Sequence, residues 1–462
     1  MTDQIADFDH VVLGGGKGGK SLAVALGNAG HHVALIEQAQ IGGTCINVAC
    51  IPTKTMVASA KLIELASRAA DFGVDVPPAG PSIAGVVDRK RSVVKGMVDA
   101  HWKLFTGTPN MTFLFGTGKF VGPRTIEVSA EDGSTSLVRG GRVYINTGSS
   151  TTIPPIPGLA TVPYLTSTSI MELEELPTRL AIIGAGYIAL EFAQMFRRLG
   201  SEVAVVQRGA RFLPREDPDI ADEVRKVLQE DGIEFLDDAE TDFVTAAATG
   251  IELTYSRNAR RDTLQCSHLL VAVGRTLNTA GLGLDAGGVQ VSPQGAIVVN
   301  DRLETTAENV YAIGDCNGGP LFTHASWDDY RILLANVLYG AGRTTAGRLM
   351  PYTLFIDPEL GRVGLTEEQA LAQGYQIAVA SLTAAKIPRA NTAGETKGVL
   401  KAVVERETGQ ILGCSLFCHS AGEIMSVVQM AMRGKVPYTE VRDTIFTHPT
   451  MAESLNLLFA AL

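Results

Sequence analysis

The chain has 462 residues, which corresponds to two to four domains at roughly 100–200 residues per domain. Apolar residues make up 45% of it and charged residues 19%, so packed cores are expected and disorder is not. With 39 basic and 49 acidic side chains the formal net charge is −10, which argues against nucleic acid or an anionic membrane as the main partner.

The segment MTDQIADFDH lacks the basic and apolar regions of a secretory signal. No apolar run in the sequence approaches the ~18 residues that a membrane span requires. We therefore expect a cytoplasmic protein with no membrane partner.

The first forty residues predict a strand, a glycine-rich turn, a helix and a second strand. Gly14, Gly16 and Gly19 follow the first strand and match G-x-G-x-x-G, and the second strand ends at Glu37. Glycines there permit a tight turn, close approach to a pyrophosphate and close helix–strand packing, and the acid can hold ribose hydroxyls. The helix N-terminus favours phosphate. This segment therefore predicts a dinucleotide site.

Two cysteines follow in GGTCINVACIPTK, residues 42–54. Five residues of regular helix rise about 7.5 Å, which exceeds the Cα separation of roughly 4.4–6.8 Å in a disulfide. A bridge between Cys45 and Cys50 therefore requires a distorted first turn, with Pro52 helping to start the regular helix after it. Such strain makes a disulfide easier to reduce. Two buried free thiols or a metal pair are the alternatives, although further metal ligands are lacking in this loop.

The residues from 87 to 105 predict a long helix. A second dinucleotide unit follows a proline-rich break at residues 153–158, with a strand at 179–183 and a helix ending near Gly200. Its turn has the form G-x-G-x-x-A and contains Gly184, Gly186, Tyr187 and Ile188. Gln207 stands where an acid would bind the ribose, and Arg208 and Arg211 follow it. A neutral residue followed by basic ones suits a 2′-phosphate, so NADPH is expected in preference to NADH.

Farther along, a helix is expected at residues 324–338 with Thr323 as its cap. From Pro351 onward, strand-like runs mix with helices, which predicts an α+β domain. The remaining cysteines are expected to be inert: Cys414 and Cys418 lie too far apart on a strand to bridge, and Cys266 and Cys316 are interpreted as core residues.

The cysteine motif resembles that of the class I flavoprotein disulfide reductases, which include dihydrolipoamide dehydrogenase, glutathione reductase and mercuric reductase. Several other motifs support the resemblance over nearly the whole chain: the two glycine fingerprints, the connecting TGSS, Val273-Gly274-Arg275, NVYAIGD and the final HPTMAE. Positions that the resemblance assigns to binding FAD or NAD(P)H, beyond those given above, are Gly43, Thr44, Lys54, Thr147, Gly148, Gly274, Arg275, Gly314 and Asp315.

The resemblance also implies catalytic roles. Cys50 would be the thiolate next to the flavin and Cys45 the interchange thiol. Lys54 would sit beside the flavin and pair with Glu191, and Tyr187 would gate the nicotinamide pocket. His448, oriented by Glu453, would exchange a proton with Cys45 of the other subunit of a homodimer. The N-terminus of the helix at 324–338 is expected to face the flavin. No metal site is expected.

The expected fold class is α/β, with two Rossmann-like domains for FAD and NAD(P)H and a C-terminal α+β dimerisation domain. The expected boundaries are 1–150 for the FAD domain, 151–273 for the NAD(P)H domain, 274–348 for the return to the FAD domain and 349–462 for dimerisation.

The segments GKGGKSLAV, CIPTKTMV, FLPREDPDIAD, DDYRI, IPRA and FTHPTMAESLN are similar to bacterial reductases of the reactive-chlorine-resistance type, relatives of mercuric reductase. The resemblance implies a small oxidant such as hypothiocyanous acid, or Cu(II), as acceptor. A dihydrolipoamide dehydrogenase, a glutathione-type disulfide reductase and a mercuric reductase remain alternatives, although no cysteine follows Cys418 to receive mercury. A flavoprotein redox sensor or docking subunit is the alternative of another class.

Overall fold

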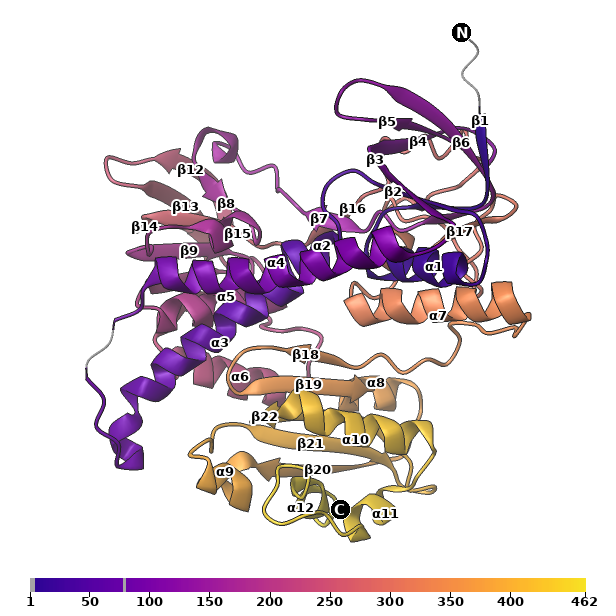
Figure 1. The fold of residues 1–462 in the computed structure, drawn as a ribbon. Helices are drawn as coiled ribbons and strands as arrows, with labels where there is room; N and C mark the ends of the chain where they lie inside the picture. The colour runs from indigo at the N-terminus through magenta and orange to yellow at the C-terminus, as the bar shows by residue number, and fades with distance from the viewer. Residues whose placement is uncertain (1–4, 78–79) are drawn as a thin grey trace. The chain divides into compact units, whose positions relative to one another are not determined.

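The computed structural model describes residues 5–77 and 80–462 (Figure 1). Residues 1–4, which belong to the segment interpreted above as lacking a secretory signal, lie outside it. The chain forms two compact units, each built from three separate stretches. The first unit comprises residues up to 55, 88–152 and 275–348, and the second comprises residues 56–87, 153–274 and 349–462.

The first unit is organised around a mixed sheet in the order β3-β2-β1-β6-β5-β4, with β17 also pairing with β6. Strands β1, β2, β3 and β17 are parallel to their partners, whereas β4 and β5 form an antiparallel extension of β6. The strands are β1 (Ile5–Leu13), β2 (Val33–Glu37), β3 (Met111–Phe115), β4 (Thr117–Gly122), β5 (Thr125–Ser129), β6 (Thr135–Ile145) and β17 (Val310–Ala312).

Two helices of this unit lie side by side, α1 (Lys17–Asn28) and α7 (Thr323–Tyr339), as Figure 1 shows. The strands β7 (Ser149–Thr151) and β16 (Arg275–Leu277) pair as a short antiparallel ribbon. The expected strand–turn–helix–strand order of the first forty residues is confirmed by β1, α1 and β2.

Three helices carry or follow the cysteine segment. They are α2 (Gly43–Asn47), α3 (Cys50–Ser67) and α4 (Ile83–Gly107). The long helix expected at 87–105 is confirmed within α4, which extends beyond it at both ends.

The second unit contains a parallel sheet in the order β11-β10-β9-β15-β8 and an antiparallel sheet in the order β12-β13-β14. Its strands are β8 (Tyr164–Leu165), β9 (Arg179–Ile183), β10 (Glu202–Val206), β11 (Ile233–Leu236), β12 (Glu240–Ala246), β13 (Ile251–Arg257), β14 (Arg260–Cys266) and β15 (His268–Val271). The helices α5 (Tyr187–Arg198) and α6 (Pro218–Glu230) pack their apolar faces into the same core, which confirms the second βαβ pattern.

The C-terminal part of this unit is an antiparallel sheet in the order β18-β19-β22-β21-β20, which confirms the α+β expectation. Its strands are β18 (Tyr352–Leu354), β19 (Glu359–Gly364), β20 (Ile377–Thr383), β21 (Val399–Glu405) and β22 (Ile411–Cys418). Its helices are α8 (Glu367–Ala372), α9 (Pro388–Thr392), α10 (Ala421–Arg433), α11 (Tyr438–Asp443) and α12 (Ser454–Phe459). Cys414 and Cys418 are buried on β22, as expected, and burial raises the pKa of Cys418 to about 12.

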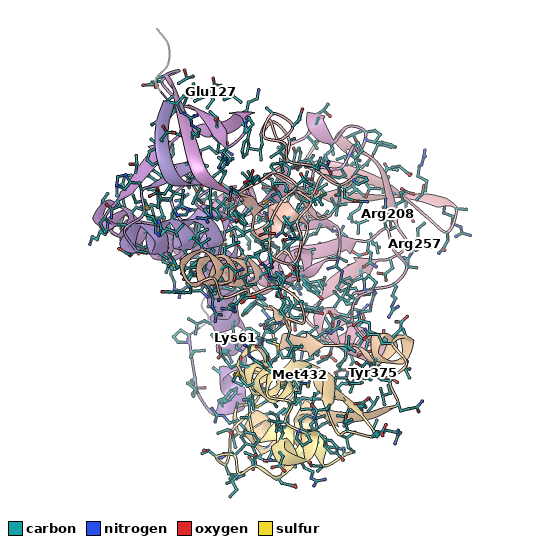
Figure 2. All side chains as sticks on the ribbon, turned by 90° about the vertical axis from the view of Figure 1, so that its right-hand side faces the viewer. Lys61, Glu127, Arg208, Arg257, Tyr375 and Met432 are labelled. Carbon is teal, nitrogen blue, oxygen red and sulfur yellow. The ribbon has the colours of Figure 1, made fainter. Side chains whose placement is uncertain are left out.

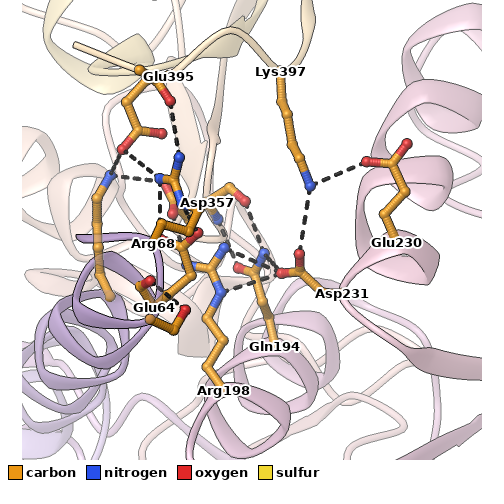
Figure 3. A network of polar contacts seen from close by, with 12 residues as sticks. Glu64, Arg68, Gln194, Arg198, Glu230, Asp231, Asp357, Glu395 and Lys397 are labelled. Atoms are coloured by element: carbon orange, nitrogen blue, oxygen red, sulfur yellow. Dashed lines mark hydrogen bonds and ion pairs between the residues drawn. The ribbon is translucent and has the colours of Figure 1, made fainter. Parts of the chain in front are cut away.

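A polar network joins separate stretches of the second unit (Figure 3). Asp357 accepts from Lys61 of α3 at 2.8 Å and from Arg198 of α5 at 2.6 Å, and Arg198 also pairs with Asp231 at 3.2 Å. Burial opposes ionisation of Asp357, but the charges of Arg198 and Lys61 prevail and lower the pKa of its carboxyl group. Lys397 extends the network to Glu230 and Asp231.

Candidate active site

The first glycine-rich turn, between β1 and α1, has room only for glycine. Gly14 has φ +104°, and a Cβ atom on it would lie 2.4 Å from the backbone oxygen of Asn146. A Cβ atom on Gly19 would lie 2.3 Å from the oxygen of Gly14, and one on Gly43 would lie 2.6 Å from Cα of Gly16. The turn thus presents bare backbone at the N-terminus of a helix, the arrangement that suits a pyrophosphate.

Glu37, at the end of β2, faces this turn. Its Oε2 accepts from the backbone nitrogen of Gly15 at 2.8 Å, and its Oε1 accepts from that of Ala39 at 2.9 Å. The carboxylate is therefore fixed beside the turn, at the position where the glycine fingerprint predicts the acid that binds the ribose.

Asn146 connects this turn to the later FAD motif, and the sequence reasoning did not single it out. Its Oδ1 accepts from the backbone nitrogen of Gly19 at 2.8 Å, and its Nδ2 donates to the oxygen of Ile313 at 2.8 Å. The adjacent Thr147 donates from Oγ1 to the oxygen of Asn278 at 2.7 Å, and Gly148 has φ +70°. The position of Asn146 directly before Thr147-Gly148 was the available indication.

Asp315 closes this part of the site. Its Oδ2 accepts from Ser149 Oγ at 2.5 Å, and Arg275 donates from Nε to the same hydroxyl at 2.7 Å. Gly314 has φ +70°, and its backbone nitrogen donates to Asp329 at 2.8 Å. These residues converge from β7, β16 and the segment after β17.

The cysteine segment is broken between its two thiols. Cys45 and Thr44 lie in α2, Val48 leaves the helical region with φ −140° and ψ 12°, and Cys50 opens α3. The expected departure from a regular helix between the cysteines is therefore present. Both cysteine side chains are partly buried.

The two thiols interact with one another and with Thr323. Cys50 Sγ lies 3.3 Å from Thr323 Oγ1. The hydrogen bond to Cys50, burial and the charge of Cys50 raise the pKa of Cys45 far above its usual range, against the effects of Thr323 and Lys20. Once Cys50 is ionised, its negative charge makes it harder for Cys45 to lose its proton. The pair therefore favours a thiolate on Cys50 and a thiol on Cys45.

Thr323 was expected to cap the helix at 324–338, and that expectation is wrong. The helix begins at Thr323, Phe322 occupies the N-cap position, and no side chain caps it. The Thr323 hydroxyl lies beside Cys50 instead. The first turn of α7 therefore faces the thiol, where its dipole favours a thiolate.

The second glycine-rich turn repeats the close approach of the first. Gly184 has φ +105°, and a Cβ atom there would lie 2.5 Å from the oxygen of Ala272. Gly186 is the N-cap of α5, which Tyr187 and Ile188 open. Gly274 has φ +144° and open space around it.

Gln207 and Arg208 follow β10. Gln207 is buried, and its Nε2 donates to the backbone oxygens of Gly209 and Arg211 at 2.7 and 2.8 Å, so the side chain holds the loop after β10 in place. Arg208 is exposed (Figure 2), whereas Arg211 lies 3.5 Å from Glu368.

Tyr187 is anchored to a buried carboxylate that the sequence reasoning missed. Its hydroxyl donates to Glu216 Oε1, which also accepts from Tyr352 at 2.6 Å. Arg362 donates to Glu216 Oε2 at 3.3 Å and to the Tyr352 hydroxyl at 3.0 Å. Burial and the charge of Glu216 raise the pKa of Tyr187 far above its usual range, so this tyrosine stays a hydrogen-bond donor.

The remaining residues that the sequence predicts for the site are His448, Glu453, Glu191 and Lys54. His448 Nδ1 lies 2.9 Å from Glu453 Oε1; a carboxylate there holds the proton on Nδ1 and leaves Nε2 free to accept one. Glu191, on α5, accepts from the backbone nitrogen of Phe355 at 3.0 Å. Lys54 lies on α3, and its pairing with Glu191 stays a prediction.

Comparison with known proteins identifies the chain. The pattern described as "Pyridine nucleotide-disulphide oxidoreductase" matches residues 8–329, and that of the family's dimerisation domain matches residues 350–458. The chain belongs to this family. It is therefore an FAD-dependent NAD(P)H oxidoreductase of the disulfide-reductase type, and the expected fold class and enzyme class are confirmed.

Members of the family resemble the chain over its whole length. It is 41% identical to the "Probable pyridine nucleotide-disulfide oxidoreductase RclA" of Escherichia coli strain K12, over 98% of this chain and 99% of that protein. A mercuric reductase of Bacillus cereus is 33% identical over 98% of this chain and 71% of that protein. The structure of a "Cu(II) complex of HOCl-induced flavoprotein disulfide reductase RclA" from Escherichia coli superposes with a TM-score of 0.91 at 39% identity, covering 99% of both chains. The resemblance to the reactive-chlorine-resistance type is thereby confirmed.

The residues present fit the FAD that the family implies. The Gly14 turn offers backbone that no side chain covers, Glu37 stands beside it, and Asp315 is fixed at the end of the second motif. The chain carries a dimerisation domain of the family. Over the residues from 5 to 77 and from 80 to 462, no helix is both long enough and apolar enough to cross a membrane.

Proposed function

We propose that this oxidoreductase passes electron pairs from NADPH through Cys45 and Cys50 to a small oxidant, as a cytoplasmic homodimer. The observation that carries the proposal is the interacting pair of thiols in the same unit as the FAD fingerprint, with Cys50 next to Thr323. Bound FAD would accept the hydride of NADPH and supply two electrons to the disulfide. One proton then completes a thiol on Cys45, and Cys50 carries the negative charge.

Different residues of the chain assist the two sulfurs. The Thr323 hydroxyl and the N-terminus of α7 stabilise a thiolate on Cys50. Cys45 attacks the acceptor after giving its proton to His448 of the partner subunit, whose imidazole Glu453 orients. Lys54 and Glu191 position the flavin end, and Tyr187 gates the nicotinamide pocket.

The preference for NADPH rests on the residues after β10. Gln207 places no carboxylate where a 2′-phosphate would lie, and exposed Arg208 can meet that phosphate with its guanidinium group. We further propose that residues 1–150 and 274–348 bind FAD, that residues 151–273 bind NADPH, and that residues 349–462 form the dimer contact.

The acceptor class follows from the relatives. The Escherichia coli structure is described as HOCl-induced and as a Cu(II) complex, and we infer a hypohalous-type oxidant, such as hypothiocyanous acid, as the acceptor of this chain too. A panel of acceptors tests this with purified holoenzyme and NADPH under anaerobic conditions: hypothiocyanous acid, Cu(II), Hg(II), oxidised lipoamide and glutathione disulfide. We expect kcat/KM to be highest for hypothiocyanous acid, and a higher value for either disulfide would contradict the assignment.

A further inference from the structure

Lys20 is a lysine held inside the first unit, one turn into α1. Only 3% of its surface is exposed, and its Nζ lies 2.7 Å from His101 Nε2 and 3.3 Å from the backbone oxygen of Gly42. His101 Nδ1 lies 2.6 Å from the oxygen of Met97. Since a carbonyl oxygen can only accept, Nδ1 carries the proton, and Nε2 is left to accept from the Lys20 ammonium group.

The charged and titratable groups that face Lys20 come from three helices. Lys17 lies on α1, His101 on α4 and Cys45 on α2. Within the described parts of the chain, no carboxylate pairs with Lys20. Burial and the charge of Lys17 lower the pKa of Lys20 to about 8, and the charge of Cys45 opposes that shift.

A buried ammonium group without a carboxylate is costly to maintain, and a strongly perturbed lysine of this kind is a candidate for a functional role. The Nζ of Lys20 donates to the oxygen of Gly42, the N-cap residue of α2, and Cys45 lies in the first turn of that helix. A thiolate that forms on Cys45 would therefore compensate the ammonium charge. Cys45 in turn needs such a neighbour, because the hydrogen bond with Cys50, burial and the charge of Cys50 all raise its pKa and disfavour its ionisation.

We propose that Lys20, oriented by His101, is the counter-charge that stabilises the Cys45 thiolate during attack on the acceptor. This rests on the proposed relay, in which Cys45 is the attacking sulfur. Lys20 keeps its protons and forms no bond; the Cys45 proton passes to the histidine base, and the ammonium group offsets the second negative charge of the dithiolate. Lys20 is thus a positioning residue that acts through the ionisation of Cys45.

The test is the pH dependence of Cys45 alkylation in the reduced holoenzyme. Dithiothreitol reduces the pair, iodoacetamide traps thiolates between pH 6 and 10, and mass spectrometry counts the label at Cys45 separately from that at Cys50. A neighbouring opposite charge shifts a pKa by about 1–3 units, so Lys20→Met, which removes that charge, should slow Cys45 alkylation at pH 7.5 by about tenfold or more. Lys17→Met is the matched control on the same helix, where the rate should stay within about twofold of wild type.

A second variant distinguishes the loss of the Lys20 charge from a folding defect in Lys20→Met. His101→Leu removes the imidazole acceptor of the ammonium group and leaves only the Gly42 oxygen, so we expect a smaller slowing, about threefold, in the same direction. Alkylation of Cys45 in Lys20→Met at the wild-type rate would overturn the proposal, as would equal slowing in Lys17→Met. Because dithiothreitol replaces NADPH, the result does not depend on the relay; failure of NADPH to produce two free thiols would contradict the relay alone.

Discussion

Replacement of Arg362 by methionine should destabilise the second unit strongly, because it leaves a carboxylate buried without its cation. Arg362 is 4% exposed and Glu216 is 1% exposed, and the two side chains meet at 3.3 Å. Removing one partner of a buried ion pair typically costs 3–5 kcal/mol. The two tyrosine hydroxyls that remain on Glu216 offset part of this, so we expect a loss of about 3 kcal/mol in the free energy of unfolding.

Urea unfolding of the holoenzyme, followed by circular dichroism at 222 nm, measures this loss. Circular dichroism is preferable to tryptophan fluorescence because both tryptophans, Trp102 and Trp327, lie in the first unit. Arg179→Met is the matched control: it removes an arginine from an exposed pair with Glu234 at 3.0 Å in the same unit, and it should cost less than about 1 kcal/mol.

The double variant decides between lost charge pairing and lost packing. If the uncompensated carboxylate causes the loss, Arg362→Met combined with Glu216→Gln should be more stable than Arg362→Met alone. A double variant whose loss equals the sum of the single losses, or an Arg362→Met loss no larger than that of Arg179→Met, would refute the reasoning. The reduction of bound flavin by NADPH should also slow in Arg362→Met, since Glu216 anchors Tyr187.

Three further predictions concern single side chains. His448→Ala should slow acceptor reduction by about 100-fold or more in stopped-flow measurements while flavin reduction by NADPH changes little, and equal slowing of both steps would exclude its proton-transfer role. Arg208→Glu should lower kcat/KM for NADPH relative to NADH by about tenfold or more in steady-state assays; an unchanged ratio would mean that the 2′-phosphate is bound elsewhere. Lys20→Met should raise stability toward urea at pH 7, because the fold lowers the pKa of Lys20 from 10.5 to about 8 and the charged form costs about 3 kcal/mol. This gain is full below pH 8 and disappears as the pH rises toward 10.5, so a gain that grows with pH would be contrary to expectation.

Most of the predictions that the structure confirms rest on patterns of neighbouring residues. The strand–turn–helix order around Gly14 and Gly184 depends on neighbouring residues, and the structure reproduces both turns with the positive φ angles that glycine allows. The break between Cys45 and Cys50 likewise followed from helix geometry and the covalent limits of a disulfide.

Contacts between distant residues could not be predicted in this way. His101 lies 81 positions from Lys20, and Thr323 lies 273 positions from Cys50, so no spacing rule connects them. A threonine at the start of a helix predicts an N-cap. The sequence does not show whether its hydroxyl binds the backbone or, as at Thr323, lies next to a distant thiol. Glu216 looked like one acid among several in FLPREDPDIAD, and only the packing of β18 and β19 distinguishes it.

Anaerobic titration of the holoenzyme with NADPH tests the central claim most directly. The relay predicts broad long-wavelength absorbance from a thiolate against the flavin, which Cys50→Ser should abolish and Cys45→Ser should retain while turnover with acceptors stops. Persistence of the band in Cys50→Ser would reverse the two sulfur roles, and its absence from the wild-type enzyme would contradict the relay itself.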